Sequence, residues 1–246
     1  MTMLHCLAIV GAIAATGGTA LAGSSGGVPM PAASRGSAAA ADGHAAAANG
    51  SSIRWRGELL SDLAVRWYHW FESIPAGVVP HGDPSGANCG ISQSGPVWFL
   101  SGPLGGTFVN ACTIPVGKAI MSPVFNVIDD YPCPAEFNFE PEPGQGLETF
   151  LKDDVAQYVN LAYTTATLDG VAQRVHRVRT PLFAFTAAES NKASDPCITG
   201  SPQLAVSEGF YVFIDPPSRG QHVLQLRSGP SVFGGATDVT INLTIK

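Results

Sequence analysis

The clearest pattern in the chain is a strict alternation of polar and apolar residues near its C-terminal end. Between residues 238 and 245 the sequence reads DVTINLTI. A period of two predicts a β-strand with one buried face and one wet face. Three earlier runs have strand length and are bounded by Gly and Pro turns, at 181–186, 209–214 and 221–227. This spacing is typical of a β-sandwich.

A hairpin is predicted immediately before these strands. The runs Tyr163–Leu168 and Val171–Val178 flank the dipeptide Asp169-Gly170. Asp-Gly between two β-forming runs is a strong short-range hairpin signal, because both turn positions require a positive φ.

Two segments have helical periodicity instead. In 57–73 the apolar residues recur every three or four positions, and Ile74-Pro75 forbids continuation of the helix. In 147–161 the same spacing recurs, with acidic residues in the early turns where they complement the helix dipole.

Two apolar runs lie between these helices. Val97–Leu100 is bounded by Gly-Pro turns and flanked by cysteines, which predicts a central buried strand inside a disulfide-tied loop. Residues 119–128 predict either a second buried strand pair or a bent strand with Pro123 at a bulge or an edge. We therefore expect a mainly β protein over residues 53–246, an antiparallel β-sandwich of jelly-roll or Ig-like type with two accessory α-helices.

The N-terminal residues predict export. Residues 1–22 contain a short apolar run and end in Ala20-Leu21-Ala22, the form of a signal-peptidase site. Residues 23–52 are rich in Ala, Gly and Ser and lack the apolar surface to fold, so they predict a disordered linker. We expect a secreted or periplasmic protein with no transmembrane anchor after cleavage, the alternative being an uncleaved signal that anchors the chain.

Removal of the signal peptide also removes Cys6 and leaves four cysteines. An even number in an exported chain predicts two disulfides. Three pairings are possible, and we favour Cys89–Cys112, which closes a short loop, together with Cys133–Cys197. The spacing contains no C-x-x-C, which argues against structural zinc.

The charge of the chain bears on the class of partner that it can bind. The formal net charge is −6 and only 13% of residues are charged, against about 25% in a typical domain. The basic residues are scattered apart from one short cluster, which argues against a phosphate-tracking surface and so against nucleic acid as a partner.

Three sets of residues are candidates for a functional site. Trp67, Tyr68 and Trp70 form an aromatic platform for a sugar ring or a membrane surface if they are exposed, or plug one end of the sandwich if they are buried. The acidic segment 129–154 supplies the oxygen ligands that calcium prefers, with a solvated acidic loop as the alternative; the metal candidates within it are Asp129, Asp130, Glu136 and Glu140. No other cofactor is expected.

The third set is catalytic. His81 and Asp83, two residues apart in a turn-dense loop, are candidates for acid–base chemistry or metal binding, with an ordinary solvated turn as the alternative. His176 and His222 complete this set. The chain has no G-x-S-x-G, H-E-x-x-H, P-loop or dinucleotide-binding motif, although a Ser/His/Asp site can be assembled from distant positions.

Several strings resemble a family of uncharacterised secreted proteins, mainly bacterial. The strings that carry the resemblance are WYHW (67–70), SIP (73–75), DPSG (83–86), QSGPVWFL (93–100) and IPVGK (114–118), followed by ATLDG (166–170), PLF (181–183) and GQH (220–222). The resemblance spans about residues 58–246. It implies export and one shared architecture, and it assigns no activity.

We therefore expect a secreted, non-catalytic binding or envelope-associated module, with an extracellular glycan or a cell-envelope component as the candidate partner. The alternative is a secreted hydrolase with a His/Asp/Glu cleft that acts on a polysaccharide or an ester. The first predicts aligned aromatic side chains on an exposed face, and the second predicts titratable groups that converge in a pocket.

Overall fold

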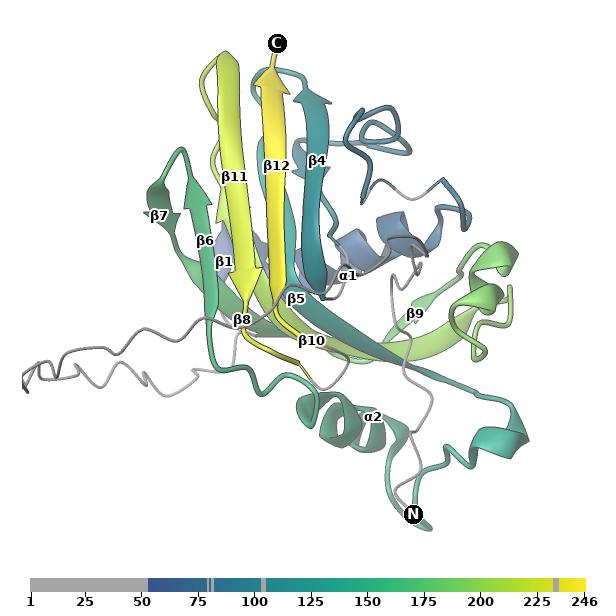
Figure 1. Ribbon diagram of the computed structural model, residues 1–246. Helices are drawn as coiled ribbons and strands as arrows, with labels where there is room; N and C mark the ends of the chain where they lie inside the picture. The colour runs from purple at the N-terminus through teal and green to yellow at the C-terminus, as the bar shows by residue number, and fades with distance from the viewer. Residues whose placement is uncertain (1–52, 79, 81, 103–104, 232–234) are drawn as a thin grey trace, which may run out of the picture. The chain divides into compact units, whose positions relative to one another are not determined.

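The fold is a β-sandwich with two accessory α-helices, as the sequence predicts (Figure 1). The computed structural model describes residues 53–78, 80, 82–102, 105–231 and 235–246. The predicted signal peptide (1–22) and linker (23–52) therefore lie outside the described residues, as does His81. Neither α-helix is long and apolar enough to cross a membrane.

The first sheet has five strands in the order β3-β5-β10-β8, with β9 also paired to β10. Its members are β3 (Val97–Phe99), β5 (Ala119–Tyr131), β8 (Val175–Arg179), β9 (Phe183–Phe185) and β10 (Gln203–Ile214). Strands β5 and β10 are the longest strands of this sheet and pair with each other along most of their length. Every residue of β5 from 119 to 130 is buried, because both of its faces are covered by other elements.

The second sheet has the order β4-β12-β11-β6-β7. Its strands are β4 (Gly106–Ile114), β6 (Thr164–Leu168), β7 (Val171–Gln173), β11 (Gly220–Ser228) and β12 (Thr237–Ile245). The alternation in β12 works as predicted: residues at odd positions from Val239 to Ile245 are buried against the first sheet, and the residues between them face outward. Burial of this apolar face stabilises the sandwich.

The long strands of the first sheet extend beyond the second sheet, and α2 (Leu147–Ala156) covers the extension. Figure 1 shows α2 below the end of the second sheet, beside β5 and β10. Leu151 and Val155 of α2 pack there against Val206. The helix ends at Ala156, earlier than the predicted residue 161.

The opposite face of the first sheet is covered by α1 (Leu60–Glu72). A two-strand ribbon, β1 (Arg54–Trp55) with β2 (Glu58–Leu59), occupies the predicted first turn of this helix. The helix stops just before Ile74-Pro75, as predicted. The described residues also include two 3₁₀ helices, η2 (Ala135–Phe137) and η3 (Glu189–Ala193).

The sheets are mixed rather than wholly antiparallel. Strand β3 pairs with β5 in parallel, and β4 pairs with β12 in parallel. The predicted central strand, β3, lies at an edge of the first sheet and not at its centre. It is nevertheless buried, because α1 packs over Val97 and Phe99.

Residues 119–128 belong to one strand, β5, which contains Pro123. Of the two predicted alternatives, a strand pair or a single bent strand, the structure has the single strand. The pairing register between β5 and β10 shifts opposite Pro123, between Phe210 and Tyr211. This irregularity accommodates the missing N–H of proline. The neighbouring Gly209 has no space for a side chain, since an added Cβ would lie 2.6 Å from the carbonyl oxygen of Phe125.

The predicted hairpin forms, with Asp169 and Gly170 at φ 52° and 78° as a turn of this kind requires. Its second half, predicted as one strand, divides at Arg174. Residues 171–173 stay in the second sheet as β7, and residues 175–179 cross to the first sheet as β8. The chain thus connects the two layers here.

Both predicted disulfides are present. Cys89–Cys112 closes a local loop, and Cys133–Cys197 joins the segment after β5 to the segment before β10. Disulfides persist in oxidising compartments, in agreement with an extracytoplasmic protein.

Candidate functional site

The aromatic residues of α1 do not form an exposed platform. Trp67 and Tyr68 are at most 1% exposed and Trp70 is also buried. Both tryptophans are hydrogen-bonded inside the protein. The indole N–H of Trp67 donates to the carbonyl oxygen of Leu100 (2.7 Å), and that of Trp70 donates to the carbonyl oxygen of Ile91 (2.9 Å). They belong to the core between α1 and the first sheet, so the packing alternative describes them better than a ligand platform.

Asp83 is part of an ordinary turn. Its carboxylate accepts hydrogen bonds from the Ser85 hydroxyl (2.6 Å) and from the backbone N–H groups of Ser85 and Asn88. These bonds, the Ser85 hydroxyl above all, lower the pKa of Asp83. This carboxylate is therefore engaged in loop structure, as the solvated-turn alternative predicts.

His176 and His222 lie on different sheets and have different surroundings. His176 in β8 is half-buried next to Phe213, with 5.8 Å between the ring centroids, and burial followed by the charge of Arg174 lowers its pKa. His222 lies at the start of β11 and contacts Asp169 and Ser218. Among the described candidates, none of the proposed catalytic groups contacts another.

The surroundings of His222 nevertheless contain a Ser/His/Asp arrangement that sequence reasoning did not find. Nδ1 lies 2.6 Å from Asp169 Oδ2, and Nε2 lies 3.4 Å from the Ser218 hydroxyl. Asp169 is fixed further by the backbone N–H of Val223, at 2.8 Å from Oδ1. The only sequence signal is the placement of Ser218 and His222 on either side of a Gly-containing turn.

This arrangement favours an imidazolium and not a general base. Nε2 is closer to the carbonyl oxygen of Ser218 (2.9 Å) than to its hydroxyl, and a carbonyl can only accept. With carboxylate and carbonyl as partners, both ring nitrogens act as donors. The hydrogen bond to Asp169, then the bond to Ser218, raises the pKa of His222. The ring must lose a proton before it can activate the serine.

The predicted metal residues do not gather at one point. Asp129 and Asp130 are consecutive in β5 and project to opposite faces of the sheet. Glu136 is exposed in η2, and Glu140 accepts a hydrogen bond from the Tyr131 hydroxyl at 2.6 Å. Among the described residues, the grouping with metal-like spacing is Asp130 with two cysteines, Cys133 and Cys197, which form a disulfide and so offer no thiolate.

Asp130 instead belongs to a buried acidic group under the end of α1. Its neighbours are Asp195 and Glu72, whose charges raise its pKa after burial itself. Gln203 Nε2 donates to Asp130, and Asn191 Nδ2 donates to Glu72 at 3.3 Å. Burial raises the pKa of Glu72 to about 7. The group thus retains protons at a pH where surface carboxylates have none.

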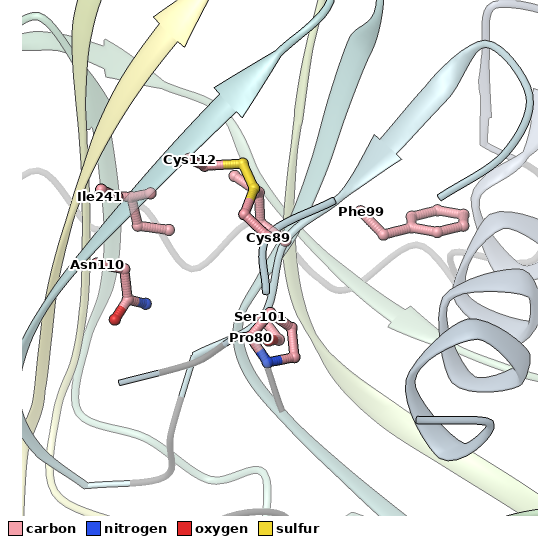
Figure 2. A pocket seen from close by; sticks show the side chains of 9 residues that line it. Pro80, Cys89, Phe99, Ser101, Asn110, Cys112 and Ile241 are labelled. Atoms are coloured by element: carbon pink, nitrogen blue, oxygen red, sulfur yellow. A yellow bond between two sulfur atoms is a disulfide. The ribbon is translucent and has the colours of Figure 1, made fainter. Parts of the chain in front are cut away.

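A small cavity adjoins the Cys89–Cys112 disulfide (Figure 2). Figure 2 shows it between the disulfide, Pro80, Asn110 and Ile241. Its volume of about 10 Å³ is the size of a single water. It is too small for an organic ligand. A wider groove of about 260 Å³ lies beside β9, and His69 is the titratable residue in its lining. The Nε2 atom of His69 lies 2.9 Å from the carbonyl oxygen of Ala184, so this ring nitrogen already has a hydrogen-bond partner.

The outer face of the second sheet carries an extended set of exposed and partly exposed polar side chains. It consists of the outward-facing residues of four strands: Thr107, Val109, Ala111 and Thr113 from β4, Asp238, Thr240, Asn242 and Thr244 from β12, Gln221, Val223, Gln225 and Arg227 from β11, and Thr165 and Thr167 from β6. In Figure 1 this face is turned to the viewer, and no described element lies over β11, β12 and β4.

This outer face is almost uncharged. Its two charged side chains, Arg227 and Asp238, pair with each other at 3.0 Å. Two apolar side chains lie among the polar ones: Val109 is 51% exposed and Val223 is 39% exposed. The cross-strand registers align Val109 with Thr240 and Gln225, and Ala111 with Asn242 and Val223. The result is a regular array of hydroxyl, amide and methyl groups.

Comparison with known proteins adds no assignment. The chain matches no protein-family model, and no curated protein and no solved structure is significantly similar to it.

Proposed function

We propose that this protein is a secreted, non-catalytic binding module that takes a neutral polysaccharide on the outer face of the second sheet. The observation that carries the proposal is the chemistry of this face. The chain has a net charge of −6, but this face offers hydroxyl and amide groups, and its two charged side chains form an ion pair with each other. Such a surface has no electrostatic preference and can pair with the hydroxyls of a sugar polymer.

The hydrogen-bonding capacity of this face is only partly used inside the protein. Thr244 Oγ1 donates to Gln221 Oε1 at 3.1 Å, and Thr167 Oγ1 is 3.4 Å from Gln225 Oε1. Both contacts use the amide oxygens and leave the two N–H donors of each glutamine for a ligand. Exposed Asn242 lies between these pairs on β12. Unused amide N–H groups are therefore present on β11, beside an exposed amide on β12.

The face is also rigid and periodic. Neighbouring strands lie about 4.8 Å apart, and successive outward side chains of one strand lie about 6.6 Å apart. The inward side chains of β11 and β12, such as Leu224 and Leu243, are fully buried in the core. A preorganised array loses little conformational entropy on binding. A repeating polymer can engage several equivalent positions of such an array.

The test is co-sedimentation of the full chain with insoluble neutral polysaccharides (cellulose, chitin, xylan and β-glucan), with anionic pectin for comparison. We expect retention by at least one neutral polymer. The double variant Thr240→Ala/Asn242→Ala should raise the Kd by about tenfold, since loss of a few weak hydrogen bonds amounts to about 1.4 kcal/mol. Asn160→Ala, at an exposed loop position away from this face, should bind like the parent chain. Equal retention of the double variant, or no retention by any polymer, would refute the proposal.

The second candidate function is a secreted hydrolase, and one observation favours an ester as its substrate: the Ser218 hydroxyl contacts His222, which contacts Asp169. In this function the serine oxygen attacks the carbonyl carbon of an ester while its proton passes to the neutral Nε2. The ester C–O bond then breaks and the leaving alcohol takes that proton, after which water hydrolyses the acyl-serine, releases the acid and restores the serine hydroxyl. Turnover of p-nitrophenyl acetate should then rise with pH as His222 deprotonates and should be lost in both Ser218→Ala and Asp169→Asn. Identical hydrolysis by the parent chain and Ser218→Ala would exclude this function.

A further inference from the structure

A second pair of carboxylates lies on the other face of β5 from Asp130, under α2. Asp129 projects from β5 where that strand has passed the edge of the second sheet, and its side chain is 1% exposed. Its cross-strand partner Val206 packs against Leu151 and Val155 of α2. Both carboxylate oxygens of Asp129 are buried, and apart from a neighbouring carboxyl group no described side chain or backbone group donates to them.

The ionisable group that acts most strongly on Asp129 is another carboxylate, that of Asp154 in α2. Burial is the main reason that the pKa of Asp129 lies well above its usual range, and the adjoining Asp154 carboxylate is the second. Asp154 Oδ1 accepts a hydrogen bond from Gln157 Nε2 at 3.2 Å, while Oδ2 is buried with no hydrogen-bond partner. Ionised carboxylates only accept hydrogen bonds, so the two cannot satisfy each other.

Three of the four oxygens of the ionised pair are therefore buried without a hydrogen-bond donor among the described residues. Among the residues the structure describes, the ion pairs do not include Asp129 or Asp154; the lysine of α2, Lys152, pairs with Glu148 at 2.6 Å. An uncompensated pair of buried carboxylates is costly. Either a proton shared between them or a bound cation removes this cost.

We propose that Asp129 and Asp154 bind a calcium ion between β5 and α2. The donor atoms are all hard oxygens, the type that Ca²⁺ prefers, and two carboxylates can supply up to four of its six to eight ligands. The phenol of Tyr158 is a further neighbour: after burial, the charges of Asp154 and Asp129 raise its pKa to about 12.

The proposed site lies near the surface on the Asp154 side. Asp154 is only partly buried and Gln157 is exposed, so the C-terminal end of α2 borders solvent, and the proposed ion would take its remaining ligands from water. The ion would neutralise the pair and join the helix to the strand extension. Calcium replaces the shared proton, so its affinity should rise with pH.

The neighbouring aspartate provides a matched control. Asp153 precedes Asp154 in the same helix but is exposed. Thermal unfolding of the metal-stripped full chain should be measured with EDTA and with 5 mM CaCl₂, at pH 8 and at pH 5.5. At pH 8 calcium should raise the Tm by about 3 °C or more, and the rise should shrink at pH 5.5. Asp129→Asn and Asp154→Asn should abolish the rise, and Asp153→Asn should retain it.

Two results would overturn the proposal. Calcium without effect on the Tm of the parent chain at pH 8 would mean that a shared proton alone occupies the site. An undiminished effect in both Asp129→Asn and Asp154→Asn would mean that calcium binds elsewhere. Asparagine can donate a hydrogen bond to the remaining carboxylate, so both variants should fold, and circular dichroism checks this. If Asp129→Asn does not fold, Asp154→Asn alone, at the partly exposed position, decides the question.

Discussion

His222 joins the turn after β6 to the start of β11 through its contact with Asp169, with 2.6 Å between Nδ1 and Oδ2. The same ring holds the carbonyl of Ser218 on its other side, at 2.9 Å. One imidazolium thus fixes two turns at one end of the second sheet. Because the contact depends on two opposite charges, its strength depends on pH.

We predict that this contact contributes most between about pH 4 and pH 6.5. The pKa of His222 is raised by Asp169, so its contribution is complete below the unfolded value and is lost as pH rises through the folded pKa. The pKa of Asp169 is lowered, first by His222, so its contribution is complete above its unfolded value and is lost as pH falls through the folded pKa. The stability difference between the parent chain and Asp169→Asn, measured by urea unfolding from pH 3 to pH 9, should peak in this window. A difference that does not vary with pH would contradict the ion pair.

Glu72→Gln should stabilise the protein at alkaline pH. The pKa of Glu72 is raised by burial to about 7, so the folded state holds a proton that the unfolded state loses above about pH 4.5. Its contribution to stability therefore falls as pH rises from 4.5 through 7. Glutamine avoids this loss and can still accept the hydrogen bond from Asn191. We expect a gain of roughly 1–3 kcal/mol at pH 8 and little change at pH 4. Equal effects at both pH values would show that Glu72 is not protonated in the folded state.

Glu208→Gln should destabilise the chain more than the matched change at a surface ion pair. Glu208 is 3% exposed and binds both Arg177 and Arg179 of β8. The arginines are partly solvated, which reduces the cost of losing a buried partner, and we expect about 1–3 kcal/mol. Glu148→Gln, which weakens the exposed pair with Lys152, should cost less than about 0.5 kcal/mol. Similar free energies of unfolding for both variants would show that burial of Glu208 does not matter.

Tyr68→Phe should cost about 1–3 kcal/mol. The Tyr68 hydroxyl accepts a hydrogen bond from Asn126 Nδ2 at 2.7 Å in the core beneath α1. Removal of the hydroxyl leaves a buried amide donor without this partner. Tyr163→Phe is the control, since Tyr163 is 47% exposed and water can replace its contacts. Denaturant unfolding measures both, and an unchanged midpoint for Tyr68→Phe would mean that the amide finds another acceptor.

Much of the fold could be predicted because local patterns determine it. The alternation in 238–245, the Asp169-Gly170 turn and the proline after α1 each act on their immediate neighbours. The pairing of strands is different, because it depends on segments far apart in the chain. The parallel pairs of β3 with β5 and of β4 with β12 have no local signal.

The candidate sites were harder to predict for a related reason. Asp129 and Asp130 read as part of an acidic loop, but they end a strand whose two faces are both buried, and the alternation of that strand separates them. Asp129 meets Asp154, and Asp130 meets Asp195, only through tertiary packing. Likewise, the tryptophans of α1 have the same sequence pattern whether they are exposed or buried.

The parallel pairing of β4 with β12 has a consequence for how the chain folds. About half of the chain separates residues 106–114 from residues 237–245, so the second sheet cannot close until its last strand is available. Such distant contacts slow folding. Until then the edges of β4 and β11 remain open to strands of other molecules, a recognised route to aggregation. Loss of residues 237–245 should therefore yield insoluble protein rather than a shortened sandwich.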